Sequence, residues 1–116
     1  MHAVRFAPAV FVTLVSCNGT RKQECDQFLA AMKPLAAGTP SVELVDTASR
    51  SVSAIQFQDQ PLREYASSTK ATLKTLSETI RLQATPSPPD GTDDLVKAKL
   101  KEARGEIDDV TRYCAE

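Results

Sequence analysis

Residues 45–80, VDTASRSVSAIQFQDQPLREYASSTKATLKTLSETI, decide the fold because one apolar ladder runs through them. The ladder advances by three and four residues in turn, which is the spacing of one face of an α-helix. Asp59 is its one charged member, and Pro61 follows closely. Proline lacks a backbone donor and clashes with the preceding turn, so we expect two helices, over about residues 40–58 and 60–82. The ladder consists of Val45, Ala48, Val52, Ile55, Asp59, Leu62, Ala66, Thr69, Leu73, Leu76 and Ile80.

Capping and loop residues set the expected ends of these two helices. Thr39 is expected as the N-cap of the first, with Pro40 at its first helical position. Asp59 is expected as a cap at the turn before Pro61. The following segment, residues 83–91 (QATPSPPDG), is rich in proline and ends in glycine, which predicts a loop.

One further helix is predicted on each side of the ladder. Thr20-Arg21-Lys22-Gln23 has the form of a capping box, and Pro34 is a stop signal, so we expect a helix over about residues 20–33. Beyond the loop, apolar residues recur at four- and three-residue steps, which predicts a helix over about residues 92–114. The apolar faces are Cys25, Phe28, Leu29 and Met32 in the first of these helices, and Val96, Leu100, Ala103, Ile107, Val110 and Cys114 in the last.

Four helices joined by short connections predict an all-α fold, a small antiparallel four-helix bundle. The alternative is an elongated bundle, in which residues 40–82 form one long helix kinked at Pro61. Phe57 and Tyr65 are expected to complete the core rather than to line a pocket. The last helix also carries interleaved charges that we expect to form a solvated face: Lys99, Lys101, Glu102, Arg104, Glu106, Asp108, Asp109 and Arg112.

Cys25 and Cys114 are predicted to form a disulfide. Each lies on the apolar face of its own helix, and an up-down-up-down bundle brings the start of the first helix and the end of the last to the same end. Closing a loop of roughly ninety residues would stabilise the fold by about 4–5 kcal/mol on the chain-entropy model. The alternative is a pair of buried free thiols that serve as small apolar side chains.

The first 16 residues, MHAVRFAPAVFVTLVS, are typical of a secretory signal peptide. Arg5 precedes an apolar run, and no acidic residue occurs before Glu24. The run is roughly half of the ~20 residues that a membrane-spanning helix needs. We therefore expect residues 1–16 to be an export signal that is removed.

The end of this segment, Leu14-Val15-Ser16-Cys17, resembles the lipobox of bacterial lipoproteins. The resemblance implies that a diacylglycerol is attached to Cys17 and that cleavage before it leaves residues 17–116 anchored to a membrane of the bacterial cell envelope. Asn18 is not the Asp that some bacteria read as an inner-membrane retention signal, which favours the outer membrane. An uncleaved apolar tail with a free Cys17 thiol is the alternative. The mature chain is also similar to small uncharacterised all-helical lipoproteins, through Tyr113-Cys114 and Cys25, and these imply no activity.

The composition argues against several classes of function. There are 14 basic and 15 acidic residues and no tryptophan, so nucleic-acid binding is not expected. The single histidine, His2, lies in the signal peptide, which removes histidine-based catalysis from the mature chain. The remaining cysteines do not have the spacing of a metal site, and the scattered glycines form no phosphate loop, so we expect no metal, no cofactor and no enzymatic activity.

These exclusions favour a non-enzymatic helical interaction module that binds another envelope protein. The alternative is a carrier of a small ligand or lipid, held in the core of the bundle. Such a carrier would need spare core volume, which small ladder residues could leave: Ala48, Ala66 and Ala103.

Overall fold

The computed structural model describes residues 20–116, and every regular element within this range is helical. Residues 1–16, where a signal peptide is predicted, and Cys17 and Asn18 lie outside the described residues. A first helix covers residues 20–32 and continues into the short 3₁₀-helix η1 (Lys33–Leu35). Three α-helices follow: α2 (Val42–Ala54), α3 (Gln60–Gln83) and α4 (Thr92–Ala115).

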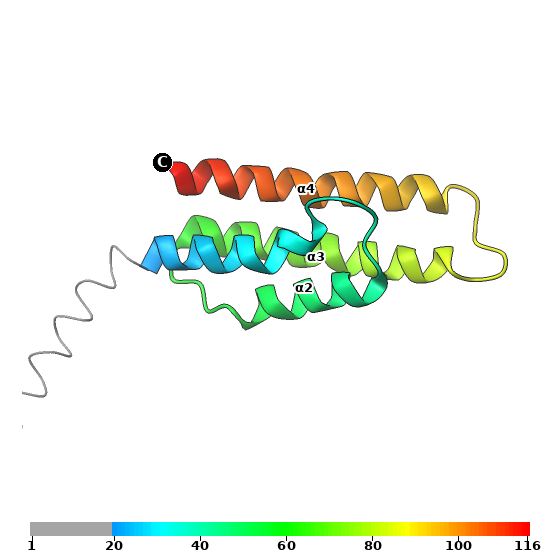
Figure 1. The fold of residues 1–116 in the computed structure, drawn as a ribbon, viewed down its shortest axis with the longest axis horizontal. Helices are drawn as coiled ribbons and strands as arrows, with labels where there is room; N and C mark the ends of the chain where they lie inside the picture. The colour runs from blue at the N-terminus through cyan, green and yellow to red at the C-terminus, as the bar shows by residue number, and fades with distance from the viewer. Residues whose placement is uncertain (1–19) are drawn as a thin grey trace, which may run out of the picture.

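The helices pack as an antiparallel up-down-up-down bundle (Figure 1). Helices α3 and α4 form the long central pair, while α2 packs against α3. Asp46, near the start of α2, binds Arg81, near the end of α3, so these two helices run in opposite directions. The compact bundle is therefore confirmed, and the alternative of one long helix kinked at Pro61 is wrong.

Helix α2 is shorter than the predicted range of 40–58. Ser41, rather than Thr39, is its N-cap, and the Ser41 hydroxyl accepts the N–H of Leu44 at 3.2 Å. The helix ends at Ala54 because Ile55 adopts an extended conformation, with ψ of 127°. Phe57, which periodicity placed in the same helix, is instead buried in the connection, with its ring 6.4 Å from that of Phe28. Helix α2 therefore ends before Phe57, whose ring packs against Phe28 of the first helix.

The first helix ends close to the predicted position, since its α-helical part stops at residue 32, before Pro34. The chain continues through η1, whose last residue, Leu35, is fully buried. The chain reverses beyond this point, where Gly38 has φ of +76°, a value that residues with a side chain rarely adopt. Arg104 of α4 supports the reversal, since its guanidinium donates to the carbonyls of Leu35 and Gly38.

The predicted apolar faces form one continuous core. Of the ladder, Ile55 and Ile80 are half-buried against this core, and the other apolar members are buried within it. Phe57 completes the core as expected, and Tyr65 is half-buried against it. The buried apolar residues are Cys25, Phe28, Met32, Leu35, Val45, Ala48, Val52, Phe57, Leu62, Ala66, Leu73, Leu76, Val96, Leu100, Ala103 and Val110.

Two glycines give a matched test of the backbone. A methyl group added at Gly105, inside α4, meets nothing within 4 Å, so Gly105→Ala is expected to stabilise the fold by about 0.4–1 kcal/mol. Gly91 is equally open but has φ of +85°, so Gly91→Ala is expected to destabilise by about 1–2 kcal/mol. Urea unfolding of the disulfide-bonded protein measures both changes. Equal effects on stability at the two positions would contradict the positive φ of Gly91.

Candidate functional site

The predicted disulfide is present at one end of the bundle. The Sγ atoms of Cys25 and Cys114 are bonded, with their Cα atoms 6.0 Å apart, and the two residues are 89 positions apart in sequence. Cys25 is buried in the first helix, and Cys114 is half-buried in the last turn of α4. The bond therefore joins the first described helix to the C-terminal end of the chain.

A polar cluster surrounds the disulfide. The hydroxyl of Tyr113 donates to Asp59 Oδ2 at 2.6 Å, and the same oxygen accepts the N–H of Leu62 at 3.2 Å. Asp59 is thus the N-cap of α3, as its place before Pro61 predicted, and it also binds α4. The hydrogen bond to Asp59, together with burial, raises the pKa of Tyr113, because an ionised phenol would lose this donor beside a carboxylate.

Arg21 covers the outer side of this cluster. Its guanidinium carbon lies 4.1 Å from the centre of the Tyr113 ring, and it donates to the carbonyl of Tyr113. A cation over an aromatic face is attracted by the negative potential of the ring. The ring of Tyr65, on α3, lies 5.9 Å from that of Tyr113. The cluster consequently holds three helices together at the end where the described chain begins.

Glu24 is a buried acid whose role the sequence did not predict. Its carboxylate accepts the N–H groups of Gln58 and Asp59 at 3.0–3.1 Å, although its side chain comes from the first helix. A buried N–H without a partner costs about 1–3 kcal/mol, so this carboxylate stabilises the connection between α2 and α3. Glu24 lies between Gln23 and the apolar Cys25 in the sequence. Nothing in these neighbours distinguishes it from an acidic residue exposed to solvent.

Glu106 corrects the prediction of a fully solvated face on α4. Only 9 % of the residue is exposed, and its Oε2 atom accepts hydrogen bonds from Ser68 at 2.8 Å and Thr72 at 3.1 Å. Its other oxygen, Oε1, and the hydroxyl of Thr69 are buried without a hydrogen-bond partner. Burial raises the pKa of Glu106 despite the hydrogen bonds from Ser68 and Thr72, and the nearby charge of Glu102 adds to the increase.

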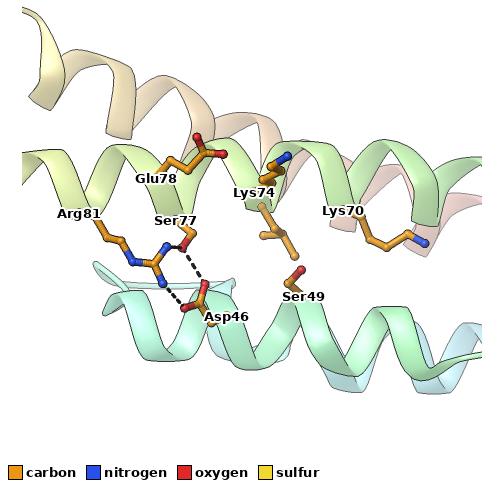
Figure 2. Close-up of a pocket in the computed structure, with 8 residues that line it drawn as sticks. Asp46, Ser49, Lys70, Lys74, Ser77, Glu78 and Arg81 are labelled. Carbon is orange, nitrogen blue, oxygen red and sulfur yellow. Dashed lines mark hydrogen bonds and ion pairs between the residues drawn. The ribbon is translucent and has the colours of Figure 1, made fainter.

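A second candidate site is the groove between α2 and α3, with a volume of about 600 Å³ (Figure 2). One end of it is closed by an ion pair, in which Arg81 contacts Asp46 at 2.6 Å. Ser77 lies between them, donating to Asp46 and accepting from Arg81. The Ser77 hydrogen bond and the charge of Arg81 hold the pKa of Asp46 below its ordinary value. The rest of the groove is lined by Ser49, Lys70, Leu73, Lys74 and Glu78, so it carries side chains of both charges.

Comparisons with known proteins give this chain no relatives: no family model, no curated protein and no solved structure matches it. Within residues 20–116, no helix is both long and apolar enough to cross a bilayer. The same part of the chain brings together no group of three or more His, Cys, Asp or Glu side chains that could hold a metal ion. The function must therefore be inferred from the geometry of the described residues themselves.

Glu106 should make stability depend on pH. Because its pKa is raised in the folded state, the native protein binds more protons than the unfolded chain between the ordinary and the raised value, and stability falls as pH rises through that window. We expect Glu106→Gln to stabilise the protein at pH 7 by about 1–2 kcal/mol, since it removes a negative charge that burial disfavours and keeps the shape of the side chain. The gain should shrink towards pH 4, as measured by urea unfolding across this range.

The control for this experiment is Glu102→Gln. Glu102 lies one turn earlier on α4, also contacts Thr72, and has a half-exposed side chain. Its substitution removes the ion pair with Lys99 and the repulsion of Glu106, but because the side chain is half-exposed we expect it to change stability at pH 7 less than Glu106→Gln does. A Glu106→Gln effect that is the same at pH 4 and pH 7 would contradict the role assigned to burial.

The disulfide gives a further prediction. Mass analysis of the protein, isolated from cells without reduction, should show peptides containing Cys25 and Cys114 linked to each other. Replacing both residues by alanine is expected to cost about 4–5 kcal/mol of stability, since the unfolded chain regains the entropy of a loop of roughly ninety residues. Two thiols that are freely alkylated in the protein isolated without reduction would show that the bond does not form.

Proposed function

We propose that this protein is a bacterial lipoprotein, anchored through Cys17, whose helical bundle is a non-enzymatic interaction module of the cell envelope. The disulfide between Cys25 and Cys114 is the observation that carries the proposal. Structural disulfides persist in oxidising compartments, which are reached by export. This agrees with the signal-like residues 1–16 and with the lipobox resemblance of Leu14–Cys17.

The position of the disulfide supports an orientation on the membrane. Thr20, the first described residue, follows Cys17 by three residues, which span at most about 11 Å when extended. The bundle end with the disulfide and Tyr113 would then face the lipid surface. Helix α4 has 24 residues and a length of about 36 Å, so the loop over residues 84–91 would lie farthest from the membrane. The sides of the bundle would remain open to other proteins.

The interaction module is favoured over the ligand carrier. Three alanines could leave space in the core, but each is at most 3 % exposed and packs within the continuous core: Ala48, Ala66 and Ala103. The groove between α2 and α3 opens at the surface, and its lining is mostly charged or hydroxylated. Such a groove suits polar contacts with a protein surface better than the enclosure of an apolar molecule. The absence of Asp at position 18 favours the outer membrane as the site of the anchor.

Metabolic labelling tests the anchor. Cells that express the full chain are grown with an alkyne fatty acid, and the protein is expected to carry the label because Cys17 is acylated. Cys17→Ala should abolish labelling, whereas the double variant Cys25→Ala/Cys114→Ala should keep it. Membrane fractionation of the labelled protein then reports the membrane in which it resides. Equal labelling of Cys17→Ala and the unchanged protein would refute the lipoprotein assignment.

A further inference from the structure

The loop between α3 and α4, residues 84–91, projects from the bundle at the end opposite the disulfide (Figure 1). Every residue from 81 to 91 is exposed, and this is the longest fully exposed run within residues 20–116. It contains Thr85-Pro86-Ser87-Pro88, in which each hydroxyl belongs to a residue that precedes a proline. A proline disfavours the helical conformation in the residue before it. The loop therefore presents two hydroxyl groups on non-helical backbone.

The two hydroxyls of the loop differ in their contacts. Thr85 donates its hydroxyl to the carbonyl of Leu82 at 2.7 Å, and its N–H binds the same oxygen at 3.1 Å. Thr85 thus closes the end of α3. Ser87 makes no hydrogen bond, through its side chain or its backbone, to any residue in the range 20–116. Its side chain can consequently enter the active site of another protein without breaking a contact of the fold.

Other exposed hydroxyls of the described chain lie on backbone that is held in place. Thr39 also precedes a proline, but Pro40 is buried, Ser41 caps α2, and the carbonyl of Gly38 is bound by Arg104. The short segment around Thr39 is therefore fixed on both sides.

Ser67 shows the same restriction in a helix. It is exposed and has no hydrogen bond from its hydroxyl within residues 20–116, but it lies inside α3. Drawing it into an extended conformation would break the hydrogen bonds of the helix. Ser87 alone in this range combines an exposed, unbonded hydroxyl with a backbone that nothing holds.

We infer that Ser87 is a site of O-glycosylation. Serine and threonine among prolines in an exposed segment are the composition of O-glycosylated regions. The Ser87 Oγ atom attacks the anomeric carbon of a sugar that is activated as a lipid-linked phosphate. The bond from this carbon to the phosphate oxygen breaks, the lipid phosphate leaves with the electron pair, and the hydroxyl proton passes to a base of the transferase.

The charge around the loop favours a sugar over a phosphate group. Residues 84–94 contain three aspartates and no lysine or arginine: Asp90, Asp93 and Asp94. A phosphate on Ser87 would add negative charge beside these carboxylates, with no basic residue of the loop to hold it. A neutral sugar carries no such penalty. The inference goes beyond the proposed function but rests on the export that it includes, since the transferase would act in the compartment where the disulfide persists.

Peptide mass spectrometry tests the inference on the full chain, isolated from the cells that naturally produce it. Trypsin cuts after Arg81 and Lys97, so Ser87 lies in the peptide 82–97. We expect this peptide to carry the mass of one or more sugar residues, located on Ser87 by fragmentation. Ser87→Ala should abolish this added mass, whereas Ser87→Thr, which keeps a hydroxyl before Pro88, should retain it. The controls Thr39→Ala and Ser67→Ala each remove another exposed hydroxyl and should leave the added mass unchanged.

Fatty-acid labelling of the same samples separates this inference from the proposed function. Ser87→Ala should be labelled as strongly as the unchanged protein, which shows that the loss of sugar is not a loss of export. A labelled protein whose peptide 82–97 carries no sugar overturns the inference and leaves the lipid anchor in place. Phosphate on Ser87, or an added mass that survives Ser87→Ala, also overturns it. If Ser87 carries a sugar while Cys17→Ala is labelled as strongly as the unchanged protein, the inference stands and the lipoprotein assignment fails.

Discussion

Asp59 is the residue on which the arrangement of the bundle depends. Its side chain caps α3 and accepts the hydroxyl of Tyr113 from α4, while its backbone N–H is bound by Glu24 of the first helix. Three helices therefore meet at one residue, at the point where the chain must reverse between α2 and α3. Hydrogen bonds that involve a carboxylate contribute roughly 1.5–3 kcal/mol each, so this junction fixes the reversal more firmly than its loop sequence could.

The disulfide and the junction at Asp59 reinforce each other because they hold the same end. Cys114 follows Tyr113 in α4, and Cys25 follows Glu24 in the first helix, so each pair of neighbours makes one covalent and one hydrogen-bonded contact. The chain between them includes all of α2 and α3. Fixing its ends in this way restricts the unfolded chain strongly and leaves the opposite end, with its proline-rich loop, free of any covalent tie in the described structure.

Local periodicity was sufficient for the helices and the core but not for contacts between helices. The steps of three and four along Val45–Ile80 predicted the buried faces because helical geometry alone sets them. They also placed Phe57 in a helix, since periodicity carries no information about the Phe28 ring that it meets. Glu24 and Glu106 were missed for the same reason, because their partners come from other helices. The disulfide was predictable because topology, rather than local sequence, brings the two cysteines together.

The two kinds of basic side chain have different roles in this structure. Every arginine in residues 20–116 donates a hydrogen bond, to a backbone carbonyl, to Thr47 or to an aspartate: Arg21, Arg50, Arg63, Arg81, Arg104 and Arg112. Among the lysines of α3 and α4, only Lys99 forms an ion pair within that range. The planar guanidinium suits fixed, directional contacts, whereas the flexible ammonium keeps its hydration at low cost. The arginines are thus engaged in contacts within the protein, whereas most lysines of α3 and α4 keep their charge unpaired at the surface.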